Sequence, residues 1–342
     1  MPLKEKLLSV FKFIKGDGKL WWLNLNKEYP KVIMLDVIIA LLPACIFGCI
    51  LFGFKALLIL LTSCFCAVLT EFLWNFIAKK PQTITNLSAL VTGLLFGMCM
   101  PDSVPLWIVA IGSIFAIAVV KQLLGGLGYN LTNPAVTSVI LLKFCFSKIM
   151  SAYHLPFYHT IEKTADYSFS DLLFGMHSGA IGETCSFLLI IGGGYLIIRK
   201  IISPIIPLTF IGSVAFLSLI FSQHILYDIF GGALILGAFF MANDYTTSPT
   251  TKSGKVLFGL GCGIFSFIIH IIFKGYDGVL FAILIMNILL ALYNRLGIGK
   301  YKEKGIEKII EFSKQIKPFS ITLWQKIKTF FKTLLKKLKS KN

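Results

Sequence analysis

Long runs of apolar residues alternate along the chain with short polar segments, and this pattern predicts an all-α, polytopic membrane protein. A transmembrane helix needs about 20 apolar residues, and several runs are shorter, so the predicted helix boundaries are approximate. We predict ten transmembrane helices, over residues 32–52, 56–78, 87–100, 105–122, 134–149, 183–198, 205–222, 226–242, 256–273 and 278–294.

The composition agrees with a membrane protein. Of the 342 residues, 56% are hydrophobic and 14% are charged, and the mean hydropathy is +0.81, values that exclude an ordinary soluble domain. The formal net charge is +17. The cations gather at the two ends and in short loops, which is typical of membrane orientation and argues against nucleic-acid binding.

The basic residues also predict the orientation of the chain. Lysine or arginine follows the second, sixth, eighth and tenth predicted helices and lies in the last turn of the fourth, on the side of the basic N-terminus. By the positive-inside rule, we expect both termini to be cytoplasmic. The flanking segments, residues 1–31 and 296–342, are basic and amphipathic. Such segments lie on anionic lipid surfaces, so we expect an interfacial helix before the membrane domain and an anchoring tail after it.

A polar connection over residues 150–182 separates five predicted helices (32–149) from five more (183–295). Transporter-like bundles often contain two halves of inverted topology. Gly128-Tyr129-Asn130 before the fifth helix resembles Gly275-Tyr276-Asp277 before the tenth. The sequence therefore predicts two inverted five-helix repeats. The connection falls on the outer side, where a loop of this length either has a function or is a plain connector.

Two acidic residues follow predicted helices that are rich in small residues. Asp244 lies in LILGAFFMANDYTTSPTT (234–251), and Asp102 ends the third helix at a corresponding position in the other half. A carboxylate is costly in a bilayer, and interrupted backbone needs protein or a cavity around it. The pattern indicates either a wall of a cofactor or ion site, or an ordinary turn. Asp244 and Asp102 are our ion-path candidates.

The segment NLTNPAV (130–136) begins the fifth helix with a polar turn. Pro134 suits a first helical position, and exposed N–H groups there would attract an anion such as a flavin phosphate or carbonyl. The alternative is an ordinary capped helix start. Asn130 and Asn133 are therefore candidate cofactor-binding residues.

Glu71, inside the second predicted helix, is either an ion-path group or a carboxylate paired with Lys79 or Lys80, and we favour the pairing. All eight cysteines lie in apolar segments without a CxxC pair, which favours inert buried thiols. The sequence contains no nucleotide-binding loop, HExxH or GxSxG pattern. We therefore predict no catalytic residue and no metal ligand.

Five segments resemble those of one family, in the same order. They are LSALVTGLLFGMCMP (87–101), KQLLGGLGYNLTNPAV (121–136), SGAIGETCSFLLIIGGGYLI (178–197), GGALILGAFFMANDYTTSPTTKSGKVLFGLGCG (231–263) and GYDGVLFAILIMN (275–287). Across residues 32–295 the chain resembles the D subunits of Rnf-type ion-translocating oxidoreductases, a superfamily that includes the B subunit of the Na+-translocating NADH:quinone reductase. The resemblance implies a multi-pass subunit of a redox complex in the bacterial inner membrane, which relays electrons among partner subunits and couples this to Na+ or H+ movement.

The resemblance also implies FMN, joined through a phosphoester to a threonine in the loop between the fifth and sixth helices. The family's [S/T]-x-A-T pattern does not occur within residues 150–182. Thr164 is the nearest positional match and Thr160 the second, while the absence of covalent flavin stays open. A second, non-covalent flavin is a further expectation. A flavin-free structural subunit and a channel or transporter of the same architecture are the alternative functions.

Overall fold

The computed structural model describes residues 30–157, 167–221, 225–231, 233–272 and 278–295. The chain divides into two compact units, Met1–Ala291 and Leu292–Asn342. In the second unit the described residues are 292–295, which end the last helix. The basic segments expected at the membrane surface lie almost wholly outside the described residues.

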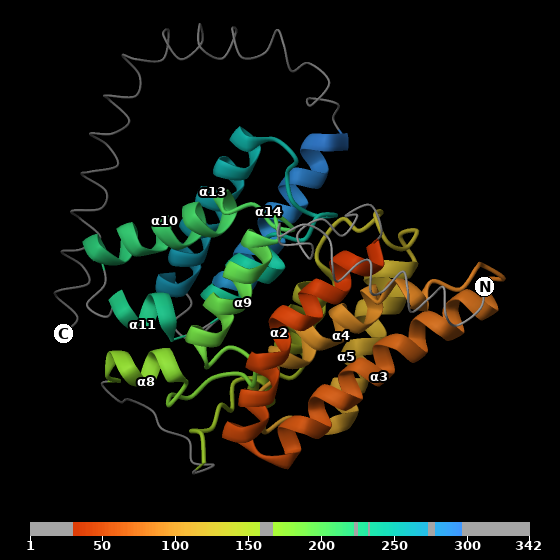
Figure 1. Cartoon of the computed structure of the whole chain (residues 1–342), viewed down its shortest axis with the longest axis horizontal. Helices are drawn as coiled ribbons and strands as arrows, with labels where there is room; N and C mark the ends of the chain where they lie inside the picture. Colours follow the sequence, from red (N-terminus) through yellow and green to blue (C-terminus); the bar gives the residue numbers. More distant parts are fainter. Residues whose placement is uncertain (1–29, 158–166, 222–224, 232, 273–277, 296–342) are drawn as a thin grey trace, which may run out of the picture. The chain divides into compact units, whose positions relative to one another are not determined.

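Helices are the only regular secondary structure in the described part of the chain, and each predicted apolar run contains at least one of them (Figure 1). In the first half they are α2 (Pro30–Phe52), α3 (Phe54–Ile77), the 3-10 turn η2 (Ile84–Asn86), α4 (Ser88–Met98), α5 (Leu106–Phe115), the π-helix η3 (Ala116–Gln122), α6 (Pro134–Cys145) and α7 (Ser147–Met150). They continue with α8 (Phe169–Phe174), α9 (Ser186–Ile198), α10 (Ile205–Phe221), α11 (Ile225–Phe230), α12 (Leu234–Leu236), the π-helix η4 (Gly237–Met241), α13 (Lys252–Ile272) and α14 (Gly278–Arg295).

Three of these helices, α2, α3 and α13, are long and apolar enough to cross a membrane. Six further apolar helical stretches in the described residues have between 10 and 17 residues, and the remaining elements are shorter. The all-helical, multi-pass class agrees with this arrangement. The number of crossings and the inverted repeat stay predictions.

Two predicted helices differ from expectation because they are interrupted. The run 105–122 changes from α5 to the π-helix η3, and the run 226–242 is divided into α11, α12 and η4. Gly231 and Gly237 lie at the breaks of the second run, where glycine disfavours a continuous helix. A π-helical turn is uncommon and is frequently found at functional sites.

The backbone after α4 is also irregular, and neighbouring protein satisfies it. The Met98 carbonyl accepts a hydrogen bond from the Gly182 N–H at 2.8 Å, and the Met100 carbonyl accepts one from the Ile181 N–H at 3.1 Å. These bonds join the end of α4 to the segment before α9. Such coverage is required where non-helical backbone lies at membrane depth.

The two halves share an apolar core, and α2 packs closely against α9. Glycine makes this contact possible, because a Cβ atom at Gly192 would collide with the Ala40 carbonyl. Near the end of α9, Arg199 pairs with Asp36 of α2 at 2.8 Å, and both side chains are less than 10% exposed. An apolar contact and a buried ion pair therefore fasten the halves together.

Candidate functional site

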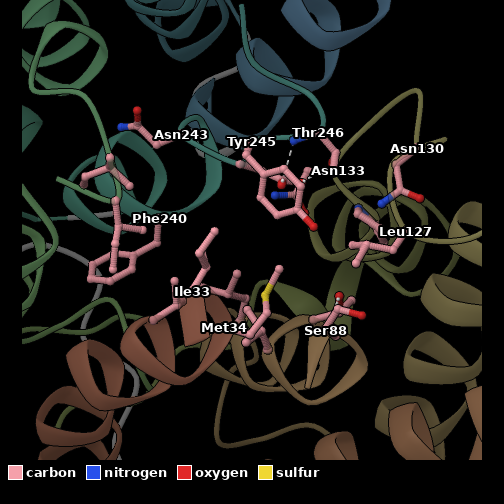
Figure 2. Close-up of a pocket in the computed structure, with 18 of the residues that line it drawn as sticks. Ile33, Met34, Ser88, Leu127, Asn130, Asn133, Phe240, Asn243, Tyr245 and Thr246 are labelled. Carbon is pink, nitrogen blue, oxygen red and sulfur yellow. Dashed lines mark hydrogen bonds between the residues drawn. The ribbon is translucent and has the colours of Figure 1, made fainter. Parts of the chain in front are cut away.

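A polar cavity, here called the first cavity, lies where several interrupted helices meet. Its volume is about 110 Å3, and Figure 2 shows its side chains converging from separate elements. The walls come from the first turns of α2, α4 and α6, the ends of α9 and η3, and the residues after η4. Polar residues that line it include Ser88, Lys121, Asn130, Asn133, Asn243, Asp244, Tyr245 and Thr246.

Asn133 is the N-terminal cap of α6. Its Oδ1 atom accepts hydrogen bonds from the N–H groups of Ala135 at 3.0 Å and Val136 at 3.4 Å. Its Nδ2 atom donates to the Met241 carbonyl at 3.2 Å, and Pro134 takes the first helical position. The amides of this turn are satisfied within the protein, which is the capped-start alternative. The expectation that they are exposed to an anion is therefore wrong.

Asn130 has an unused acceptor, unlike its neighbour Asn133. Its Oδ1 atom is buried without a hydrogen-bond partner among the described residues, and Asn130 lines the first cavity near Leu127 (Figure 2). Leaving a buried acceptor unpaired costs roughly 1–3 kcal/mol, so a donor from a ligand or ordered water is expected there. Asn130 keeps its place as a cofactor-binding candidate.

Asp244 reaches the first cavity from the turn after η4. Its Oδ1 accepts a hydrogen bond from the Thr246 N–H at 3.2 Å, and its Oδ2 accepts one from the Thr246 hydroxyl at 3.0 Å. Burial raises the pKa of this carboxyl above its ordinary value, while the bonds from Thr246 and the Lys121 charge oppose that shift. A carboxyl in such surroundings is suited to exchanging a proton or a cation.

The turn that holds Asp244 is supported by Asn287 of α14. The Asn287 Oδ1 atom accepts from the Asn133 N–H at 3.1 Å, and its Nδ2 atom donates to the Thr247 carbonyl at 3.0 Å. One side chain thus joins the start of α6 to the backbone after η4. Sequence reasoning missed Asn287, whose signal is an amide in the middle of an apolar run.

A buried ion pair contributes Lys121 to the cavity wall, beside Ser88. The Lys121 ammonium donates to the Glu71 carboxylate oxygens at 3.1 and 3.2 Å and to the Ser88 hydroxyl at 2.7 Å. The Lys121 and Glu71 side chains are each 1% exposed. The expected pairing of Glu71 with Lys79 or Lys80 is therefore wrong. Packing of η3 against α3 brings Lys121 to Glu71, whereas Lys79 and Lys80 are exposed.

Asp102 lies away from the first cavity. Ser88, at the start of α4, lines that cavity, whereas Asp102 follows the other end of this 11-residue helix, about 15 Å away at 1.5 Å per residue. Its carboxylate oxygens are each 2.9 Å from the His154 Nδ1 atom. The structure therefore does not bring Asp102 and Asp244 into one cavity.

The second cavity is larger, about 280 Å3, and lies at the opposite end of α9. Gly179 and Glu183, before α9, line the second cavity, while Leu196 and Ile201, at its end, line the first. The 13 residues of α9 separate the two cavities by about 20 Å. Polar residues that line the second cavity are Tyr153, Ser178, Glu183, Tyr227, Asp228, Ser266 and His270.

Thr164 and Thr160, the candidate attachment residues for FMN, lie outside the described residues, and both stay predictions. The described ends of their loop meet the second cavity, where Tyr153, Ser178 and Gly179 are lining residues. These ends show where the loop joins the helices.

The fold and the two cavities define an integral membrane protein with polar sites built among interrupted apolar helices. Residues 25–300 match the NQR2, RnfD, RnfE family. The chain belongs to this family. The resemblance stated for residues 32–295 is thereby confirmed.

Three relatives show how far the similarity extends. The chain is 37% identical over 299 residues to the D subunit of the Na(+)-translocating ferredoxin:NAD(+) oxidoreductase complex of Acetobacterium woodii, covering 83% of the chain and 93% of the relative. It is 36% identical over 290 residues to the D subunit of the proton-translocating ferredoxin:NAD(+) oxidoreductase complex of Clostridium ljungdahlii, covering 76% and 88%. It is 30% identical over 263 residues to the D subunit of the ion-translocating oxidoreductase complex of Methanosarcina acetivorans, covering 77% and 88%.

Proposed function

We propose that this chain is the membrane subunit of an ion-translocating electron-transport complex, and that it relays electrons through flavin while coupling their passage to Na+ or H+ movement. One observation carries the proposal: in a member of this family, a cavity beside interrupted helices is lined by a carboxyl, Asp244, and by Asn130, whose Oδ1 atom has no hydrogen-bond partner among the described residues. Its partners are the other subunits of the redox complex, as the names of the relatives indicate for those proteins.

The chain crosses the bacterial inner membrane ten times, as two inverted five-helix repeats with both termini in the cytoplasm. The two cavities support this arrangement, because part of the wall of each comes from corresponding places in the two halves. The starts of α2, α4 and α6 and the end of η3 line the first cavity. The segment before α9, the α11–α12 region, the end of α13 and the start of α14 line the second. The basic ends, residues 1–31 and 296–342, bind the anionic lipid surface.

A non-covalent flavin occupies the first cavity when bound. The residues suit such a ring in character, because Asn130 supplies an amide at the cavity wall and Ile33, Leu127 and Phe240 provide apolar surface (Figure 2). The cavity is smaller than the roughly 300 Å3 typical of ligand pockets, so binding requires a side chain to move. Tyr245, which is 46% exposed and lines the cavity, is the residue placed to do so.

FMN attached to Thr164, or secondarily to Thr160, is the other flavin of the proposal. A bound flavin supplies one- and two-electron transfer, and the protein supplies its position and electrostatic surroundings. The residues of this chain that act on ions are Asp244, at the first cavity, and Asp102, at the far end of α4.

The covalent flavin is tested by in-gel fluorescence of the SDS-denatured chain, followed by mass analysis of the peptide over residues 150–182. The chain is produced with an active flavin transferase. We expect a fluorescent band and an FMN adduct at Thr164, and we expect Thr164→Val, but not Thr160→Val, to abolish both. If the adduct is lost in Thr160→Val and kept in Thr164→Val, the FMN is attached to Thr160. A dark wild-type band contradicts the covalent flavin and favours the flavin-free structural subunit.

The non-covalent flavin is tested by comparing Asn130→Ala with Asn133→Ala. Asn130→Ala is expected to lower the flavin released from the denatured complex severalfold without changing its thermal stability, because Oδ1 has no partner within the described protein. Asn133→Ala removes a helix cap and leaves the Met241 carbonyl unpaired, which should cost about 2 kcal/mol of stability. Flavin release and thermal unfolding in detergent are measured together. Equal flavin release from wild type and Asn130→Ala would contradict the assignment.

A channel or transporter of the same architecture is the competing function. It would move ions in proteoliposomes without an electron donor, whereas the proposed subunit moves them only during electron transfer. Ion flux measured in the assembled complex with and without the reduced donor separates the two functions.

A further inference from the structure

The first cavity has two charged side chains in its wall, and their charges have opposite signs. Among the described residues that line it, these are Lys121, near the end of η3, and Asp244, after η4. Each charge acts on the other. An ammonium and a carboxylate at one cavity favour a direct, charge-assisted hydrogen bond. In this structure the partners of Lys121 prevent that pairing.

The donors of the Lys121 ammonium are directed to oxygen atoms that do not belong to Asp244. The Nζ atom lies 3.1 and 3.2 Å from the two carboxylate oxygens of Glu71 and 2.7 Å from the Ser88 hydroxyl. A lysine ammonium has three N–H donors, and these three contacts occupy them. Asp244 instead accepts its hydrogen bonds from the N–H and hydroxyl groups of Thr246. The ammonium is therefore held by Glu71 and Ser88 and not by Asp244.

Glu71 is itself held in place from several sides. Its Oε1 atom also accepts hydrogen bonds from the Thr83 hydroxyl at 2.7 Å and from the Gln122 Nε2 atom at 3.1 Å. The Asn75 Nδ2 atom donates to the same threonine hydroxyl at 2.9 Å. The Glu71 side chain is 1% exposed and is not among the described residues that line the first cavity. This network fixes the carboxylate behind Lys121, outside the cavity wall.

The charges of Glu71, Lys121 and Asp244 together leave one negative charge at the first cavity. Glu71 and Lys121 neutralise each other through their direct contacts, so the charge of Asp244 remains. A carboxylate that is withdrawn from water favours a partner of opposite charge. The cavity, at about 110 Å3, has room for a monovalent cation and a few water molecules, each of which takes about 30 Å3. One such cation would balance the remaining charge.

We propose that Glu71 is a positioning residue of the ion path, which holds the Lys121 ammonium and thereby keeps Asp244 available to one monovalent cation. The inference rests on the proposed function, in which Asp244 acts on the transported ion. Without the Glu71 carboxylate, the ammonium is free to pair with Asp244 and takes the place of the cation. Without Lys121, two negative charges attract the cation more strongly. The affinity for the cation therefore follows the summed charge of the three groups.

The test measures redox-driven Na+ uptake by the assembled complex in proteoliposomes, as a function of Na+ concentration at one fixed pH. Glu71→Gln removes the remaining negative charge and should raise the half-saturating Na+ concentration about tenfold. Lys121→Met leaves two negative charges and should lower that concentration severalfold. The double variant Glu71→Gln with Lys121→Met has one negative charge again, so its half-saturating concentration should lie within about twofold of the wild-type value.

The opposite directions of the two single variants separate positioning from mere support of the fold. Damage to packing would shift both single variants in the same direction, and that result overturns the inference. Lys79→Met removes an exposed lysine and should keep the wild-type value, because solvent and salt screen its charge. The amount of assembled complex is measured for every variant, and the transport rate is normalised to it.

The double variant decides the test where Lys121→Met does not accumulate in the membrane. A double variant with a half-saturating Na+ concentration near that of the wild type supports the inference, because a second buried substitution then restores what Glu71→Gln removed. A double variant with the same high value as Glu71→Gln overturns it.

Asp244→Asn separates this inference from the proposed function. Loss of coupled transport in Asp244→Asn, together with an unchanged half-saturating Na+ concentration in Glu71→Gln, overturns the inference alone. Wild-type transport that is independent of Na+ also overturns the inference, while the proposed function stands with H+. A wild-type complex that moves ions without electron transfer overturns the proposed function.

Discussion

Replacing Lys121 by methionine is expected to destabilise the protein by about 3–5 kcal/mol, the usual effect of leaving one buried charge without its partner. The Glu71 carboxylate, 1% exposed, would lose the ammonium that contacts both its oxygens. The neutral hydrogen bonds that remain come from Gln122 at 3.1 Å and Thr83 at 2.7 Å. The measurement is thermal unfolding of the purified complex in detergent, where Lys121→Met should lower the midpoint by several degrees.

Two controls distinguish the effect of breaking the Lys121–Glu71 pair from the effect of losing any lysine. Lys79→Met removes an exposed cation beyond the end of α3, and a surface charge contributes little, so the unfolding midpoint should stay within error. The double variant Glu71→Gln with Lys121→Met removes both charges, and it should recover part of the lost stability because no unpaired charge is left. A Lys121→Met midpoint equal to that of the wild type contradicts the importance of the pair.

Asp244→Asn is expected to reduce redox-coupled ion transport at least tenfold while electron transfer between donor and acceptor persists. Asparagine keeps a carbonyl oxygen for the Thr246 N–H, so the turn after η4 should hold its shape. It loses the negative charge that a cation or proton requires. The expected size corresponds to the loss of a charged interaction.

Ion uptake and donor oxidation are measured in the same proteoliposomes, so that the ratio of ions to electrons is obtained directly. The relatives at 37% and 36% identity are named for Na+ and for protons respectively, so both ions are followed. Asp102→Asn, at the far end of α4, should lower the same ratio. An unchanged ratio in Asp244→Asn would remove this residue from the ion path.

The sequence predicted the helical segments well because apolar runs have a strong and local signal. Each of the ten runs contains helix within the described residues. The π-helical turns η3 and η4 were not predicted, because an extra residue within a turn leaves the pattern of apolar residues almost unchanged. Their positions depend on packing between segments that are distant along the chain.

The candidate site was predicted in part. Asp244 and Asn130 lie in the first cavity, as residues of one site should. The sequence allowed two interpretations of Asn133, as an N-cap or as a ligand-binding residue, because the neighbouring residues in the sequence are the same in both cases. The predicted partner of Glu71 was wrong because the true partner, Lys121, is 50 residues away, whereas Lys79 and Lys80 are close in sequence.

The close contact between α2 and α9 limits how the protein moves during turnover. Many transporters achieve alternating access by rocking one repeat against the other. Such rocking would separate Gly192 from Ala40 and break the 2.8 Å pair between Arg199 and Asp36. It would also open the apolar core that the halves share. Rearrangement of the turns after α4 and η4 would leave the Gly192–Ala40 contact and the Arg199–Asp36 pair in place. We therefore expect the contact between α2 and α9 to stay closed during turnover, so that any movement is confined to shorter segments.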